Sequence, residues 1–337
     1  MSESILTFDD VVIAYRQRRE LGKAPAVNGV SFQLLSGESL GLVGESGSGK
    51  TSIGAAVVGL APVRSGRISF NGQDITHLRS SRRRVLSSDI QVIFQDPLSS
   101  LNPDRTIGQT LSEPLLVQRT STKQEIQSAV TAMLGRVGLE EESAAFYPSQ
   151  FSGGQRQRIA IARALMVSPR LVVCDEAVSA LDLSVQAQIL NLLLTLQRDL
   201  NLSYLFISHD IDVVKHMCER IVVLYRGEIM EVGDAQQICA HPNHPYTEEL
   251  ISSIPVPDPL LQKCRREERQ SRRREMETVD SSFHVSAIAA GCPFLARCPI
   301  SVDRCQVEDP ALLVAPSGSL SACHLRETYP SVHSRAN

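Results

Sequence analysis

The chain of 337 residues lacks the features that would place it in a membrane, on an export route or on a nucleic acid. It has no run of about 18 or more apolar residues, so we expect no segment that spans a bilayer. Its first residues carry neither a basic segment nor an apolar core, so we do not expect export. A net charge of −3 argues against a nucleic-acid partner bound mainly through electrostatics. We therefore expect a protein of the cytoplasm.

The composition is that of a globular protein, with 42% hydrophobic and 21% charged residues. The length predicts about two domains. Eight cysteines are present, and half of them crowd the C-terminal end of the chain. In a reducing compartment, cysteines are free thiols or metal ligands before they are disulfides.

Short apolar strands alternate with helices along much of the chain, which predicts a mostly parallel α/β sheet. A small antiparallel sheet is expected from the first strands, with residues 4–15 as an edge strand. Helical periodicity over 107–145, interrupted at Pro114 and Gly138, predicts an inserted helical subdomain at about 96–165. The other expected strands are 27–34, 39–43, 67–72, 90–94, 171–174, 204–207 and 221–225, and the other expected helices are 52–58, 155–167, 186–200 and 211–218.

One stretch between an apolar strand and a helix fits the phosphate-loop pattern G-x-x-x-x-G-K-[ST] without a mismatch. Its glycines permit close backbone approach, so that N–H groups and the helix N-terminus can surround phosphate oxygens. Lys50 would reach the β- and γ-phosphates, and Thr51 would reach Mg²⁺. The predicted nucleotide-binding residues are Gly44, Glu45, Ser46, Gly47, Ser48, Gly49, Lys50, Thr51 and Ser52.

A second helix N-terminus that could bind an anion follows about 100 residues later, at Ser152, Gly153, Gly154 and Gln155. A monomer with one nucleotide has no obvious use for two such sites. The stretch closely resembles the signature of ATP-binding cassette (ABC) ATPases, in which this helix caps the nucleotide held by the partner subunit's phosphate loop. Phe151 replaces the commoner Leu and keeps the position apolar.

The resemblance extends to two acidic residues that end a buried strand. Asp175 matches the Walker B carboxylate that holds Mg²⁺ through water, and Glu176 matches the residue that polarises the attacking water. Gln95 resembles the Q-loop glutamine, which touches Mg²⁺ and the lytic water, and His209 the switch histidine at the γ-phosphate. Ala177 stands where the family usually has Pro, which loosens that turn.

Two further positions follow from the resemblance. Asp182 belongs to a stretch like the D-loop, which crosses to the partner subunit. Tyr15 resembles the aromatic residue that stacks on adenine, although Phe8 lies on the same predicted strand. The implied reaction is ATP hydrolysis by in-line water attack, with Mg²⁺ as cofactor, in a site that a second ATPase subunit completes.

The C-terminal residues indicate which group of ABC ATPases the chain resembles. Residues 241–250 resemble the HPY segment of ATPase subunits from oligopeptide, dipeptide and nickel importers, and 95–103 also resemble that group, most closely its F-type subunit. The resemblance implies a partner ATPase, often a different chain, two membrane permeases and an extracytoplasmic binding protein. The chain would then lie at the cytoplasmic face of the membrane. A soluble ABC ATPase with a mechanochemical or regulatory role is the alternative.

We expect a nucleotide-binding domain over 1–240 and a C-terminal extension over 241–337. Within the extension, an exposed connection with some helix at 242–282, which includes an Arg-rich charge run, precedes a cysteine-bearing tail. The extension has four thiols at spacings wider than the usual zinc knuckle, and some importers of this group carry an iron–sulfur cluster here. A [4Fe–4S] cluster, zinc, and unligated or disulfide-linked thiols remain open for Cys292, Cys298, Cys305 and Cys323.

Overall fold

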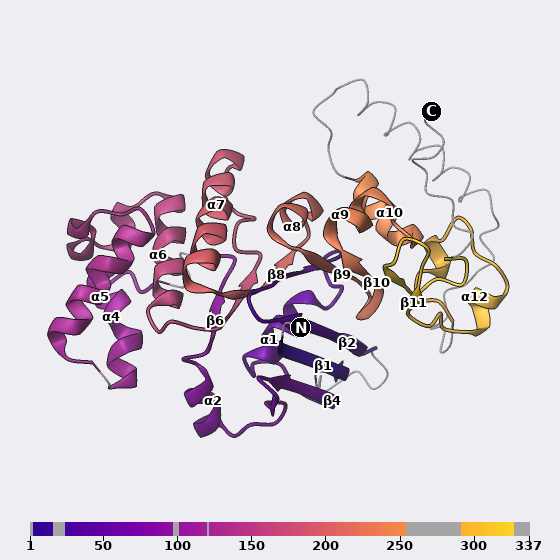
Figure 1. Ribbon diagram of the computed structural model, residues 1–337, viewed down its shortest axis with the longest axis horizontal. Coiled ribbons are helices and arrows are strands. Elements are labelled where there is room, and N and C mark those ends of the chain that lie inside the picture. Colours follow the sequence, from indigo (N-terminus) through magenta and orange to yellow (C-terminus); the bar gives the residue numbers. More distant parts are fainter. Residues whose placement is uncertain (1–2, 16–23, 97–100, 120, 254–290, 327–337) are drawn as a thin grey trace.

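The computed structural model describes residues 3–15, 24–96, 101–119, 121–253 and 291–326. Two sheets form the centre of the molecule (Figure 1). Helices α4, α5 and α6 lie at one end of the larger sheet, and the C-terminal segment with β11 and α12 lies at the other. The predicted charge run falls outside the described residues, and the predicted division at residue 240 stays a prediction. The prediction of an exposed connection from residue 242 is wrong over 242–247, which are buried.

The smaller sheet is antiparallel, as expected, with the strand order β2-β1-β4-β5. The prediction that the first strand is an edge strand is wrong, because β1 pairs with β2 on one side and β4 on the other. The strands are β1 (Ser4–Ile13), β2 (Val27–Leu35), β4 (Val63–Phe70) and β5 (Gln73–Asp74).

The larger sheet has the order β11-β12-β10-β9-β3-β8-β7-β6. Its pairs from β9 through β3, β8 and β7 to β6 are parallel, which confirms the α/β class, whereas β10, β12 and β11 are antiparallel. Sequence analysis missed β10. The strands are β3 (Ser39–Val43), β6 (Ile90–Ile93), β7 (Leu171–Asp175), β8 (Ser203–Ser208), β9 (Arg220–Tyr225), β10 (Glu228–Asp234), β11 (Leu313–Val314) and β12 (Leu320–Ser321).

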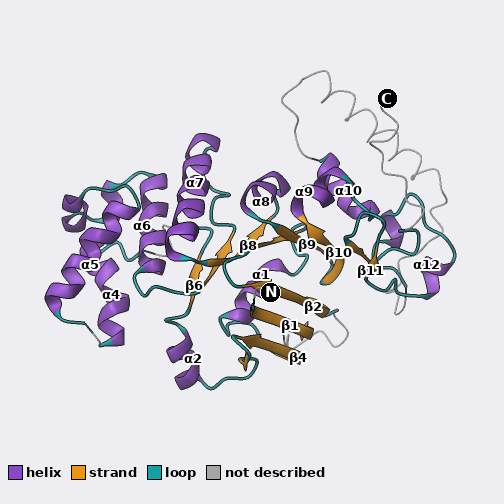
Figure 2. Ribbon diagram, viewed as in Figure 1, coloured by secondary structure: helices purple, strands orange, loops and turns teal. Residues whose placement is uncertain are grey.

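The helices flank the sheets (Figure 2). Pro114 lies inside α4 rather than ending it; the chain leaves this helix at Arg119, which is left-handed. Gly138 follows α5 with φ 72°, as the interruption there predicts. The helices are α1 (Lys50–Val57), α2 (Ser80–Leu86), α4 (Ile107–Gln118), α5 (Lys123–Arg136), η1 (Glu141–Ala145), η2 (Pro148–Gln150), α6 (Gly153–Leu165), α7 (Leu183–Leu200), α8 (Ile211–Met217), α9 (Ala235–Ala240), α10 (Pro245–Ser252), η3 (Leu295–Arg297) and α12 (Arg304–Val307).

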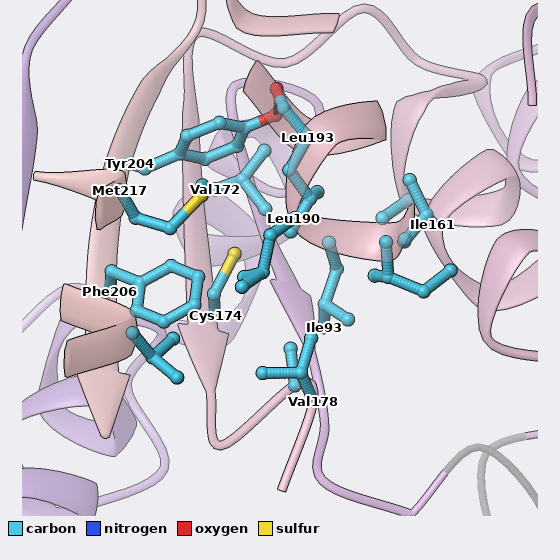
Figure 3. Packing of buried hydrophobic residues seen from close by; sticks show 14 of the residues in the cluster. Ile93, Ile161, Val172, Cys174, Val178, Leu190, Leu193, Tyr204, Phe206 and Met217 are labelled. Carbon is cyan, nitrogen blue, oxygen red and sulfur yellow. Dashed lines mark hydrogen bonds between the residues drawn. The ribbon is translucent and has the colours of Figure 1, made fainter. Parts of the chain in front are cut away.

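Side chains of the central strands alternate between two apolar clusters. Val172, Cys174 and Phe206 face the cluster that includes residues of α6, α7 and α8, as Figure 3 shows in part. Val173 and Leu205 face the cluster that includes α1 and the smaller sheet. Because both faces of the larger sheet are covered, its central strands are continuous apolar runs in the sequence.

No helix within the described ranges combines the length and the hydropathy that crossing a membrane requires.

Candidate nucleotide-binding site

The predicted site residues meet at one edge of the larger sheet. Strands β3, β8, β7 and β6 are parallel neighbours, so the residues that end or follow them lie at the same edge. The phosphate loop follows β3, Gln95 follows β6, Asp175 ends β7 and His209 follows β8. The fold therefore brings together four segments that are up to about 165 residues apart in the chain.

The phosphate loop turns directly into α1. Gly44 has φ 152°, and a Cβ there would lie 2.1 Å from the carbonyl oxygen of Leu224, so only glycine fits this approach. Gly49 is left-handed, with φ 103°, immediately before α1 begins. Lys50 Nζ donates to the carbonyl oxygens of Gly44 at 2.7 Å and Glu45 at 2.9 Å. Burial lowers the pKa of Lys50.

Two of the three predicted Mg²⁺ ligands are in contact. Thr51 Oγ1 donates to Asp175 Oδ1 at 3.2 Å. Burial raises the pKa of Asp175, while the Thr51 hydrogen bond acts in the opposite direction. Gln95 lies exposed after the neighbouring strand β6. A hydroxyl, a carboxylate and an amide supply the oxygen atoms that Mg²⁺ prefers, so these residues fit the ion.

Glu176 and His209 form the second contact of the site, with Glu176 Oε1 3.3 Å from His209 Nδ1. Glu176 is left-handed, with φ 50°, and its N–H donates to the carbonyl oxygen of Ile207. This conformation costs a residue with a side chain about 1–3 kcal/mol, which the surrounding structure must offset. The turn that Ala177 was expected to loosen is tied to α6, because Gln157 Nε2 donates to the Ala177 carbonyl oxygen at 2.6 Å.

The signature stretch opens α6, two residues earlier than the sequence predicts. Ser152 Oγ accepts a hydrogen bond from the Gln155 N–H at 3.3 Å, and Gln155 Oε1 accepts one from the Ser152 N–H at 2.9 Å. This reciprocal pair is a capping box. Ser152 and Gly153 are exposed, while a Cβ at Gly154 would lie 2.5 Å from Val185 Cγ1 on α7.

The structure separates the two aromatic candidates. Phe8 is buried and stacks on Phe32 at 4.5 Å between ring centroids, so it belongs to the core. Tyr15 is 51% exposed, and its hydroxyl donates to Ser52 Oγ at 3.2 Å, at the start of α1. Asp182 is exposed at the N-cap of α7.

The four C-terminal cysteines, Cys292, Cys298, Cys305 and Cys323, are among the residues that line one cavity of about 10 Å³, close to the room that one water molecule needs. Burial raises the pKa of Cys292 to about 11 and that of Cys298 to about 12. Within the part of the chain that the structure describes, no cysteine forms a disulfide, and no three His, Cys, Asp or Glu side chains are arranged to hold a metal ion.

The HPY segment reaches the phosphate loop. His244 Nδ1 accepts the Tyr246 N–H at 3.0 Å and caps α10, and burial lowers the pKa of His244 to about 3. The Tyr246 hydroxyl accepts the N–H of Glu45 at 2.9 Å. Arg297, which sequence analysis missed, forms an ion pair with the Glu45 carboxylate. A lone arginine near a cysteine gives no signal of such a contact.

Comparisons with known proteins agree with this geometry. A family model described as ABC transporter matches residues 27–179, and one described as oligopeptide/dipeptide transporter, C-terminal region, matches 230–305. The oligopeptide transport ATP-binding protein OppF of Salmonella typhimurium is 44% identical over 290 residues, 85% of this chain and 84% of that protein. The oligopeptide transport ATP-binding protein AppF of Bacillus subtilis is 42% identical over 330 residues, 96% and 98% of the two chains.

A solved structure supports the fold. The dimeric ATP-binding cassette MJ0796, in a post-hydrolysis state with ADP and Pi, aligns with a TM-score of 0.62 and 27% identity over 68% of this chain and 98% of that one. Strand order, phosphate loop and signature helix together define the class, an ABC ATPase. Within that class the chain belongs to the ATP-binding proteins of oligopeptide and peptide ABC transporters, as its sequence predicts.

Proposed function

We propose that this chain hydrolyses ATP to drive uptake of peptides or a similar small solute through two membrane permease subunits. The observation that carries the proposal is the meeting, at one sheet edge, of the phosphate loop, Asp175, Glu176 and His209. The relatives named for oligopeptide transport, and the matching C-terminal region, support import as the task. The chain would act at the cytoplasmic face of the membrane, with substrate delivered by an extracytoplasmic binding protein.

Each residue at this edge would have its own role in binding and hydrolysing ATP. Lys50 and the loop N–H groups would hold the β- and γ-phosphates, and Thr51, Asp175 and Gln95 would hold Mg²⁺. Bound Mg²⁺ neutralises charge on the transferred phosphoryl group. Glu176 would polarise the attacking water. His209, whose Nδ1 lies 3.3 Å from Glu176 Oε1, would contact the γ-phosphate and fix the Glu176 side chain.

The second half of each site would come from a partner ATPase subunit, which we propose is a different chain. Ser152 and Gly153 are exposed at the α6 N-terminus, where they can meet a nucleotide held by the partner. Asp182 is likewise exposed for contact across the dimer. Tyr15 would stack on adenine, which is worth about 1–3 kcal/mol where aromatic residues stack on bases. ATP binding would close the dimer, and hydrolysis would reopen it.

We also propose that Cys292, Cys298, Cys305 and Cys323 hold a metal centre. Four thiols are enough for a [4Fe–4S] cluster, and the resemblance to importers that carry a cluster here favours it; the four thiols line one cavity. The cavity is small, so a cluster would have to move the thiols apart, whereas a zinc ion would need less room. Anaerobic purification decides between them: brown protein with iron and labile sulfide supports the cluster, and colourless protein with zinc contradicts it.

Glu176→Gln tests the catalytic assignment. We expect ATP hydrolysis by the chain, assembled with its membrane partners, to fall by about 10²–10⁴-fold while ATP binding is retained, because the amide cannot take the proton of the attacking water. Glu142→Gln, at an exposed carboxylate on η1, is the matched control and should hydrolyse ATP at the wild-type rate. Unchanged hydrolysis in Glu176→Gln would contradict the proposal.

A further inference from the structure

The phosphate loop is held by residues from the far end of the chain. Arg297 Nη1 and Nη2 donate to the two carboxylate oxygens of Glu45, each at 2.8 Å. The backbone N–H of Glu45 donates to the Tyr246 hydroxyl at 2.9 Å. Side chain and backbone of Glu45 are therefore both fixed from the C-terminal segment, across sequence separations of 252 and 201 residues.

Arg297 is itself held on several sides. Its Nη2 also donates to Glu249 Oε1 at 2.6 Å, from the helix α10 that carries Tyr246. The guanidinium lies 5.6 Å from the ring centroids of both Tyr225 and Phe294. Such stacking and the two-pronged ion pair suit the planar guanidinium better than an ammonium group. These contacts fix the position from which Arg297 reaches the loop.

The charge of Glu45 makes this contact consequential for phosphate binding. A carboxylate within a loop that cradles polyphosphate repels its ligand unless a cation neutralises it. Lys50 Nζ contacts the carbonyl oxygen of Glu45, so the paired partner of the carboxylate is Arg297. A glutamate carboxyl is ionised at neutral pH even at its ordinary pKa, and the hydrogen bonds from Arg297 lower the pKa of Glu45 further.

We infer that Arg297 is a positioning residue for the phosphate loop: it neutralises Glu45 and, together with Tyr246, fixes the loop for ATP. The inference rests on the proposed function and extends it, because it makes the C-terminal segment part of the machinery that sets nucleotide affinity. Cys298 follows Arg297 directly and lines the cysteine cavity, so the same segment carries both features.

The test is a double-mutant cycle on ATP affinity, measured by titrating the purified full-length chain with a fluorescent ATP analogue. Arg297→Ala should weaken binding by about five- to tenfold, because it leaves the negative charge of Glu45 in the phosphate loop without its ion-pair partner. In the Glu45→Gln background, the same substitution should change affinity by less than about twofold. Arg297→Lys keeps the positive charge but not the paired hydrogen bonds of the guanidinium, so its ATP affinity should lie between those of Arg297→Ala and wild type.

The matched control is Arg304→Ala, since Arg304 also directly precedes a cysteine of the same segment. Arg304 pairs with exposed Glu308, four residues on, and among the residues that the structure describes its hydrogen bonds and ion pair go to Glu308 and not to the phosphate loop. We expect ATP affinity of this variant to equal that of wild type. Thermal unfolding of each variant shows whether the fold is retained, and Arg297→Lys keeps the cycle decisive if the Ala variant does not fold.

The outcomes separate the inference from the proposed function. Wild-type affinity in Arg297→Ala overturns the inference and leaves the proposed function intact. A loss in Arg297→Ala that persists in the Glu45→Gln background also overturns it, because Arg297 would then act on the fold rather than through Glu45. A wild-type chain that binds no ATP contradicts the proposed function itself. The inference is supported if Arg297→Ala weakens ATP binding when residue 45 is the native Glu but not in the Glu45→Gln background.

Discussion

Substitutions at Ser152 should separate the stability of α6 from ATP hydrolysis. Ser152 Oγ accepts the Gln155 N–H, so it caps α6 through a lone pair and leaves its own proton free to donate to a phosphate oxygen. Ser152→Ala removes both interactions. Ser152→Asp keeps the cap but places a carboxylate where the partner's nucleotide should bind. Ser152→Thr keeps both and serves as the control.

The expected magnitudes follow from these contacts. Loss of the cap in Ser152→Ala should lower the free energy of unfolding by about 1 kcal/mol, or at most about 2–4 °C in Tm. Asp retains the cap and adds a favourable charge at the helix N-terminus, worth about 0.3–1 kcal/mol. At 4 Å, a carboxylate repels one phosphate charge by about 4 kcal/mol for an effective dielectric constant of 20. Solvent screening reduces this, so we expect hydrolysis to fall by at least about tenfold.

Two measurements check the argument: thermal unfolding of each purified chain, and ATP hydrolysis by each chain assembled with its partner subunits. Ser152→Asp should be at least as stable as wild type and should hydrolyse ATP at least about tenfold more slowly, and Ser152→Ala should be less stable than Ser152→Asp. Near-wild-type hydrolysis by Ser152→Asp would refute the placement of Ser152 against a phosphate. Equal stability of the Ala and Asp variants would refute the capping argument.

Two further predictions concern stability. Gly41→Ala places a methyl carbon 2.0 Å from Val214 Cγ1, between β3 and α8, and should lower the free energy of unfolding by about 1–3 kcal/mol. The control is Gly135→Ala, at an exposed position of α5, which should raise the free energy of unfolding by about 0.5–1 kcal/mol because its Cβ meets nothing within 4 Å. Denaturant titrations in which Gly41→Ala is not the less stable of the two variants contradict the packing argument. Burial raises the pKa of Glu231 above 4.5, so its contribution to stability is complete below pH 4.5 and is lost as pH rises through the folded-state pKa. Glu231→Gln should flatten this part of the pH profile of unfolding free energy, and an unchanged profile would exclude this carboxyl as its source.

The phosphate loop and the α6 start could be predicted because their signals lie in contiguous residues. Glycine, lysine and capping residues act within a few positions of one another, so the local pattern determines the local structure. The convergence of Gln95, Asp175 and His209 could also be predicted, because parallel strands bring their carboxyl ends to one edge.

Strand pairing was harder to predict from the sequence. Whether β1 is an edge strand depends on β4, which returns from beyond α1, and nothing in residues 4–15 specifies that partner. Strand β10 was missed because Glu231 interrupts its apolar pattern, yet Glu231 is fully buried. Its Oε1 accepts hydrogen bonds from the Asn243 backbone N–H and the Ser319 hydroxyl, which lie 12 and 88 residues away.

The contact of Arg297 with Glu45 also has a consequence for the timing of folding. Protein synthesis proceeds at about 5–20 residues per second, so the 252 residues between them take about 13–50 s to make. Until Arg297 leaves the ribosome, Glu45 stays without its ion-pair partner. The phosphate-loop motif has been synthesised once residue 51 is made, but both contacts to Glu45 can form only after residue 297 has been made. A nascent or truncated chain thus carries the motif before it carries the finished site.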